Sequence, residues 1–88
     1  MVKKEITKEK AYEVASQIGI NFDAVDFSID DFTKGMNVEL EHGLCDTETN
    51  VTDDDPLITG KIALAHLKEF GDYYVRLDIM EKEAEGKI

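Results

Sequence analysis

The sequence has few of the residues on which several protein classes depend. Its one cysteine, Cys45, excludes an intramolecular disulfide, and the first ten residues lack the apolar segment of a secretory signal. No apolar run approaches the roughly 20 residues that a helix needs to cross a bilayer. We therefore expect a reducing, cytoplasmic location and no membrane partner.

Basic residues are also scarce. Lys and Arg number 10 against 20 Asp and Glu, so the net charge is −10. This field repels the phosphates of nucleic acid, and the few lysines near the N-terminus are interrupted by glutamate. We expect no nucleic-acid partner. A basic protein surface or a cation fits the charge better, although the charge could also serve solubility alone.

Catalytic motifs are missing as well. The chain has no glycine-rich phosphate loop, no Cys-x-x-Cys and no Gly-x-Ser-x-Gly. Cys45 follows His42 by three residues, so the two could in principle act as a thiol and its base. The acidic neighbours Asp46 and Glu48 disfavour the thiolate, however. We therefore favour a non-enzymatic protein.

The length and the hydrophobic content predict one globular domain. The 88 residues are 42% hydrophobic, enough for a single core. Helical periodicity predicts helices over residues 8–18, 29–42 and 56–69, and a fourth from residue 73 toward a frayed end. Residues 20–27 read as a loop that sends apolar anchors into the core: Phe22, Val25 and Phe27. We expect 1–6 and 85–88 to fray.

Local signals set the predicted helix boundaries. Thr7, Ser28, Asp55 and Asp72 stand at N-cap positions, and Pro56 suits a first helical position. The third helix carries apolar side chains on almost every side, so we place it in the centre of a compact all-α domain. The fourth helix has one apolar stripe, made of Tyr73, Leu77, Met80 and Ala84.

The sharpest chemical hypothesis is a metal site. Glu39 and His42 form a Glu-x-x-His on the second helix, and His66 and Glu69 repeat that spacing in reverse order on the third. Residues three apart share a helix face, so the four side chains could converge on a divalent metal. The alternative is structural: His66 would be a core histidine that hydrogen-bonds to Tyr73 or Glu39.

An acidic loop precedes the third helix. Its oxygen-bearing side chains alternate as in the first half of an EF-hand, but Val51 replaces the glycine and Leu57 the bidentate glutamate. Weak binding of a hard cation is one expectation, with Asp46, Glu48, Asn50 and Asp53 as ligands. The other is that the aspartates at 53–55 stabilise the positive end of the next helix.

Several segments together carry a recognisable pattern: FTKGMNVELEHG (32–43), Asp46, TNVT (49–52), TGKIALAHLKE (59–69) and DYY (72–74). With them the chain resembles a family of small uncharacterised proteins, a domain of unknown function of bacteria and tailed phages. The likeness spans roughly residues 8–82. It implies no activity, cofactor or catalytic residue, and it is consistent with one constellation containing both histidines.

Three functional classes follow from these observations. A non-enzymatic binding or accessory module without a cofactor is the leading hypothesis, with a protein as its partner. A metalloprotein that uses the Glu/His cluster is the second. The third is a structural homo-oligomer with a leftover apolar face. The residues expected on that face are Leu57, Leu64, Val75 and Ile79.

Overall fold

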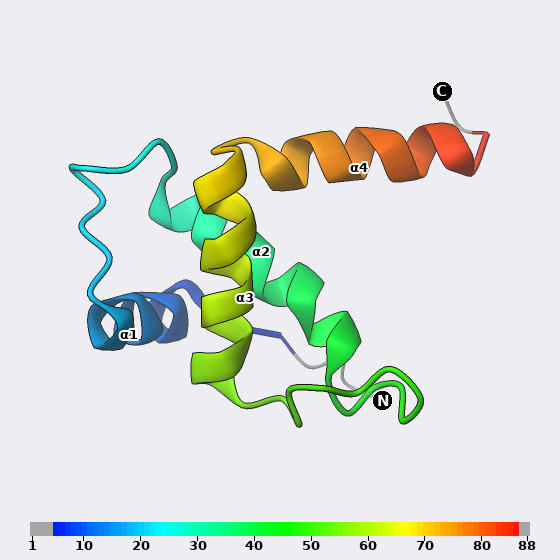
Figure 1. Ribbon diagram of the computed structural model, residues 1–88, viewed down its shortest axis with the longest axis horizontal. Helices are drawn as coiled ribbons and strands as arrows, with labels where there is room; N and C mark the ends of the chain where they lie inside the picture. Colours follow the sequence, from blue (N-terminus) through cyan, green and yellow to red (C-terminus); the bar gives the residue numbers. More distant parts are fainter. Residues whose placement is uncertain (1–4, 87–88) are drawn as a thin grey trace.

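The computed structural model describes residues 5–86, and its regular elements are helical. They are α1 (Lys8–Ile18), α2 (Ile29–Glu39), the short 3₁₀ helix η1 (Leu40–His42), α3 (Pro56–Glu69) and α4 (Tyr73–Ala84) (Figure 1). No strand occurs within the described range. The all-α prediction is confirmed, and η1 accounts for the end of the predicted second helix. Within residues 5–86, no helix has the length and apolar character needed to cross a membrane.

Three helices start where the capping side chains predicted them. The Thr7 hydroxyl accepts a hydrogen bond from the Lys10 amide at 3.1 Å. Ser28 and Asp31 form a reciprocal capping box, with each side chain accepting from the backbone amide of the other residue. Asp55 accepts from the first two amides after Pro56, at 2.9 and 3.1 Å. These bonds satisfy amides that have no partner inside the helix.

The start of α4 differs from the prediction. Asp72 makes no capping hydrogen bond, because its backbone (φ −102°, ψ 24°) departs from the extended conformation usual at an N-cap. Its carboxylate instead accepts from Nε of Arg76 at 2.8 Å. This bond holds the pKa of Asp72 below its usual value and raises that of Arg76. Asp72 therefore pairs along the helix instead of capping it.

The core lies where α1, α2 and α3 meet. Phe32 and Met36 on α2 are completely buried, and Phe27 reaches the core from the preceding loop. Phe22 and Val25 pack partly buried against it, so the predicted loop anchors are confirmed. The remaining core side chains come from α1, α3, α4 and the N-terminal segment: Ile6, Ala11, Val14, Ala15, Ala63, Leu67 and Tyr74.

The central position of α3 depends on a close approach at Gly60. A Cβ atom there would lie 2.5 Å from Cγ1 of Val14 and 3.3 Å from the Phe32 ring. The missing side chain thus lets α3 contact α1 and α2, and α3 also contacts α4. Its first turn is more exposed to solvent than its apolar sequence predicts: Leu57 and Ile58 are 37% and 45% exposed.

The segment before α1 is anchored to α2. Ile6 is 7% exposed, and its backbone amide donates to Oδ1 of Asn37 at 2.8 Å. The Asn37 side-chain amide donates in return to the Ile6 carbonyl at 3.0 Å. Ile6, within the segment that we expected to fray, is thus bonded to α2 and packed against the core. The fraying expected at 1–4 and 87–88 lies outside the described residues, and residues 85 and 86 are exposed.

Helix α4 extends beyond the other helices (Figure 1). Only Tyr74 is buried on it. Along the predicted apolar stripe, Tyr73 and Leu77 are half-buried, but Met80 is 55% exposed and Ala84 is exposed. The stripe packs against the core only as far as Leu77, because the helix then runs past the edge of the bundle (Figure 1).

The apolar residues proposed for an oligomer face are spread over the molecule. Leu57 lies in the first turn of α3, at the end remote from α4, whereas Val75 and Ile79 lie on α4 (Figure 1). Leu64 is half-buried and packs against the core. These four side chains therefore do not form one continuous face.

Candidate functional site

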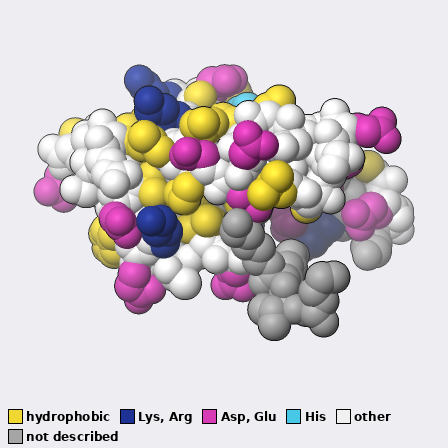
Figure 2. Space-filling model, turned by 90° about the horizontal axis from the view of Figure 1, so that it is seen from below, with side chains coloured by type: hydrophobic (Ala, Val, Ile, Leu, Met, Phe, Trp, Pro, Cys, Tyr) yellow, Lys and Arg dark blue, Asp and Glu magenta, His cyan; other side chains and the backbone are white. Residues whose placement is uncertain are grey.

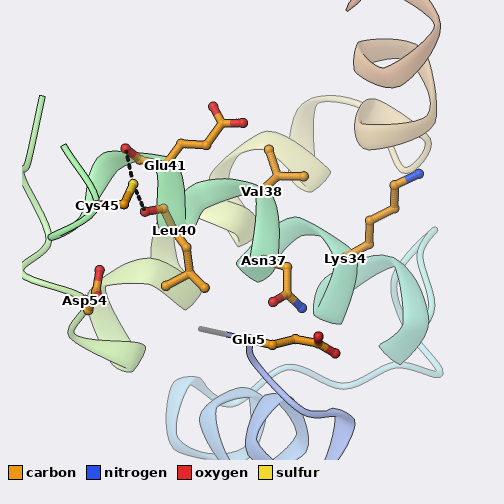
Figure 3. Close-up of a pocket in the computed structure, with 8 residues that line it drawn as sticks. All are labelled: Glu5, Lys34, Asn37, Val38, Leu40, Glu41, Cys45 and Asp54. Atoms are coloured by element: carbon orange, nitrogen blue, oxygen red, sulfur yellow. Dashed lines mark hydrogen bonds between the residues drawn. The ribbon is translucent and has the colours of Figure 1, made fainter. Parts of the chain in front are cut away.

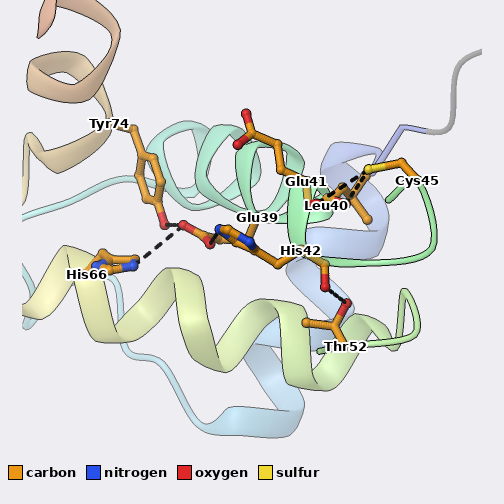
Figure 4. A network of polar contacts seen from close by, with 8 residues as sticks. All are labelled: Glu39, Leu40, Glu41, His42, Cys45, Thr52, His66 and Tyr74. Carbon is orange, nitrogen blue, oxygen red and sulfur yellow. Dashed lines mark hydrogen bonds and ion pairs between the residues drawn. The ribbon is translucent and has the colours of Figure 1, made fainter. Parts of the chain in front are cut away.

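The site is built around a buried carboxylate. Glu39, the last residue of α2, is 4% exposed and points between α3 and α4 (Figure 4). A carboxylate seldom occupies such a position without a partner, since burial removes its hydration. The partner is the Tyr74 hydroxyl, which donates to Oε2 of Glu39 at 2.7 Å. This bond connects the end of α2 with the start of α4.

Gly35 makes room for the tyrosine. It lies one turn before Glu39 on α2, and a Cβ atom there would fall 2.5 Å from Cε2 of Tyr74. The tyrosine ring therefore packs directly on the backbone of α2, and its hydroxyl reaches the carboxylate four residues further along. Residues four apart lie on the same side of a helix, which explains why both positions serve one ring.

The surroundings keep the Tyr74 hydroxyl protonated. Burial raises the pKa of Tyr74 well above its ordinary value, and the hydrogen bond to the Glu39 carboxylate raises it further. A phenolate beside a buried carboxylate would place two negative charges in a poorly solvated position. Tyr74 is thus a permanent hydrogen-bond donor to Glu39.

Both histidines lie next to the same carboxylate. Nε2 of His66 is 3.7 Å from Oε2 of Glu39, and Nε2 of His42 is 3.7 Å from Oε1 (Figure 4). The His66 side chain is 33% exposed and that of His42 is 50% exposed, so both rings reach solvent. Either ring attracts the Glu39 carboxylate when both of its nitrogens carry a proton, because the ring is then positively charged.

Aromatic stacking fixes the orientation of His66. Its ring lies parallel to that of Tyr73, with centroids 4.3 Å apart and 12° between the planes. It also meets the edge of Tyr74, at 6.2 Å. The structural hypothesis expected His66 to hydrogen-bond to Tyr73 or Glu39. Both residues are neighbours, but His66 stacks on Tyr73, and the 3.7 Å between its Nε2 and Oε2 of Glu39 is longer than a hydrogen bond.

The structure brings three of the four predicted metal ligands together and leaves the fourth apart. Glu39, His42 and His66 are neighbours, whereas Glu69 is exposed in the last turn of α3 and forms no ion pair with the described residues. The two imidazoles face different oxygens of Glu39. Within residues 5–86, no group of three or more His, Cys, Asp or Glu side chains is arranged to hold a metal ion.

Sequence reasoning missed Tyr74. We placed Tyr73 on the apolar stripe of the fourth helix and gave Tyr74 no role. In the structure Tyr74 is 3% exposed and Tyr73 is half-buried. Gly35, four residues before Glu39, leaves space for a bulky ring on α2, but it does not identify the residue that supplies the ring.

The predicted hard-cation ligands divide between two local turns. Asp46 accepts a hydrogen bond from the Glu48 amide at 3.0 Å. Asn50 and Asp53 pair with each other, through a side-chain bond of 2.7 Å and a backbone bond of 2.8 Å. Oxygens of Asp46, Asn50 and Asp53 therefore accept hydrogen bonds that stabilise the turns of the loop.

Only one of the three consecutive aspartates caps α3. Asp55 does so, whereas Asp53 bonds to Asn50, and Asp54 accepts from the Leu44 amide at 2.9 Å. Asp53 and Asp54 adopt φ values of 53° and 61°, the left-handed region that aspartate tolerates better than most residues. Hydrogen-bond capping of α3 thus comes from Asp55, while Asp53 and Asp54 form bonds within the loop.

The acidic loop also holds His42 in place. The amides of Val51 and Thr52 donate to the His42 carbonyl at 2.7 and 3.2 Å. Thr52 is 1% exposed, and its hydroxyl lies 3.4 Å from the same carbonyl (Figure 4). The loop therefore folds back onto η1, which positions the imidazole beside Glu39.

A separate groove lies along α2 and the acidic loop (Figure 3). Its volume is about 560 Å³, and the side chains of Glu39 and the two histidines do not line it. The Cys45 thiol at its edge donates toward the Leu40 and Glu41 carbonyls, at 3.4 and 3.5 Å. The lining residues are Glu5, Lys34, Asn37, Val38, Leu40, Glu41, Cys45 and Asp54.

Comparison with known families identifies the chain. Residues 11–83 match the family described as protein of unknown function (DUF5661). The chain belongs to this family. The match includes Glu39, His42, His66 and Tyr74, and it confirms that the sequence is that of an uncharacterised domain family. No curated protein and no solved structure shows significant similarity to the chain.

Proposed function

We propose that this DUF5661 protein is a non-enzymatic protein-binding module whose binding surface is α4. The observation that carries the proposal is the exposure of apolar side chains on that helix. Val75, Ile79 and Met80 are 47%, 49% and 55% exposed. Grouped apolar side chains left in water are typical of surfaces that a partner covers.

The buried polar site supports this role as an anchor. Tyr74 bonds to Glu39, and Tyr73 stacks on His66. Both contacts hold the first turn of α4 against α2 and α3. The rest of the helix then extends from the bundle in a defined direction. A binding helix that is already folded and oriented loses little conformational entropy when its partner docks.

The charge and the free thiol set the expected context. A net charge of −10 disfavours nucleic acid as the partner, and acidic side chains lie among the hydrophobic ones on the face seen in Figure 2. The exposed Cys45 supports a reducing, cytoplasmic compartment. We further propose that members of the family occur in bacteria and tailed phages.

Photo-crosslinking from α4 tests the proposal. A photoreactive amino acid replaces Ile79 in one variant and Ser16, an exposed residue of α1, in the control. Extracts of the source cells are then irradiated with each variant. We expect discrete protein adducts from position 79 that are absent from position 16. Equal labelling from both positions would contradict the proposal, and adducts of dimer mass would favour the oligomer hypothesis instead.

The proximity of Glu39, His42 and His66 favours a second candidate function, binding of a divalent metal. Nε2 of each histidine is 3.7 Å from a Glu39 oxygen. The hydrogen bond from Tyr74 orients the carboxylate, as outer-shell hydrogen bonds orient the ligands in metal sites. The half-exposed His42 would have to rotate for the three ligands to share one ion. Such a site would supply nitrogen and oxygen donors suited to Zn²⁺.

Zn²⁺ titration by calorimetry, with metal content by mass spectrometry, tests this second function. The test variant is His66→Ala, and the matched control is Glu69→Gln, which the structure places outside the cluster. Stoichiometric binding that is lost in the first variant and kept in the second would support the site. Equal binding by both variants would place the metal elsewhere.

A further inference from the structure

We propose that the partner covering α4 is a basic amphipathic helix of another protein. This inference rests on the proposed function and specifies the chemistry of the partner. Two properties of α4 carry it: apolar side chains on two of its sides, and a negative charge that its own basic residues do not balance.

The apolar side chains are spaced for helix packing. Val75 and Ile79 lie one turn apart and share a side of α4. Met80 lies on a different side, about 100° further around the helix from Ile79. It continues the stripe that begins with the half-buried Tyr73 and Leu77. An apolar stripe on a partner helix can pack against either side of α4, as helices pack side by side.

The charges on α4 favour a basic partner. Both of its basic residues are already paired along the helix: Arg76 Nε lies 2.8 Å from Asp72, and Lys82 Nζ lies 3.1 Å from Asp78. Glu81 and Glu83 are exposed and form no ion pair within the described range. Partner lysines or arginines beside the apolar contacts would meet these two carboxylates.

The net charge argues against a second copy of the chain as the partner. Two molecules of charge −10 repel each other, and α4 would bring its own glutamates against those of the copy. A basic helix gains from the same field, which also accelerates its association at low salt. Charge complementarity therefore selects the basic helix.

Designed peptides test the inference. The probe is a helical peptide of about 18 residues, five helical turns, with leucine at i, i+3, i+4 and i+7 positions and lysine elsewhere. One control peptide has the same composition in scrambled order, and a second has glutamate in place of lysine. Binding is measured by fluorescence anisotropy at low and high salt, and the contact surface by NMR chemical-shift changes.

The expected result is specific for α4. The ordered lysine peptide should bind at least about tenfold more tightly than either control, a difference of about 1.4 kcal/mol. It should shift the NMR signals of Val75, Ile79 and Met80. Val75→Ser with Ile79→Ser should lower its affinity about tenfold. The matched control, Leu57→Ser with Ile58→Ser, alters exposed apolar residues at the far end of α3 and should bind normally.

Other outcomes would overturn the inference. Equal binding of the scrambled peptide would show that charge alone suffices, and equal effects of the two double variants would place the contact elsewhere. Light scattering that shows a dimer closing over α4 would identify a second copy as the occupant. If Ile79 crosslinks to a protein without a basic amphipathic segment, the inference fails while the proposed function stands. If crosslinks and peptide binding are both absent, both fail.

Discussion

The Tyr74 hydroxyl donates a hydrogen bond to Glu39 over 2.7 Å and so joins residues 35 positions apart in the sequence. Tyr74→Phe removes the donor and leaves the carboxylate buried. We expect a loss of about 1–3 kcal/mol in the free energy of unfolding, the usual cost of an unsatisfied buried group. Urea denaturation measures it. Tyr12→Phe, at a residue that is 51% exposed, is the control. A loss no larger than that of the control would show that this bond contributes little.

Gly35→Ala should destabilise the protein even though alanine favours helix by about 1 kcal/mol. The added methyl group would lie 2.5 Å from the Tyr74 ring, so α4 or the ring must move. A double-mutant cycle with Tyr74→Ala, followed by thermal unfolding, isolates this contact. The cost of Gly35→Ala should largely disappear in the Tyr74→Ala background. A cost that persists there would trace to α2 itself.

Alkaline pH should weaken the fold through Tyr74. Its pKa is raised in the folded state, whereas in the unfolded chain it ionises near its ordinary value of about 10. The contribution is fully present below pH 10 or so and falls as the pH rises further, because the unfolded chain then binds fewer protons. Wild type should therefore lose more stability above that pH than Tyr74→Phe. Tyrosinate absorbance measured during unfolding checks the assignment, and parallel curves for the two proteins would refute it.

Thr52→Val should loosen the acidic loop. The Thr52 hydroxyl accepts from the Asp54 amide at 3.1 Å in a position that is 1% exposed, and valine keeps the shape but cannot accept. We expect a stability loss of about 1–2 kcal/mol and faster hydrogen exchange at the Asp54 amide. Thr47→Val, at an exposed residue of the same loop, is the control. Unchanged exchange at Asp54 would mean that the amide depends on another acceptor.

The helices could be predicted from the sequence because their boundaries depend on local chemistry. Ser28 and Asp55 act on amides two or three residues away, so their effect does not depend on the tertiary fold. The apolar periodicity that predicted the second helix comes from side chains such as Phe32 and Met36, which are completely buried in the structure. These interactions join residues that are close together in the sequence, so the local pattern of residues is enough to predict them.

The candidate site could be predicted only in part. Glu39, His42 and His66 were grouped correctly as neighbours by their spacing on two helices. The choice of Tyr74 over Tyr73 as the buried ring depends on the angle at which α4 leaves α3, which no local pattern encodes. The same holds for Asp54, whose carboxylate bonds to Leu44 ten residues earlier instead of to the helix that follows.

The Ile6–Asn37 pairing has a practical consequence for protein production. Asn37 bonds to both the amide and the carbonyl of Ile6, so these two bonds hold the segment before α1 against α2. A deletion that removes Ile6 would leave Oδ1 of Asn37 without its donor and its side-chain amide with the Thr33 carbonyl alone, and it would uncover the apolar surface beneath. Affinity tags and truncation boundaries on the N-terminal side should therefore leave residues from Glu5 onward intact.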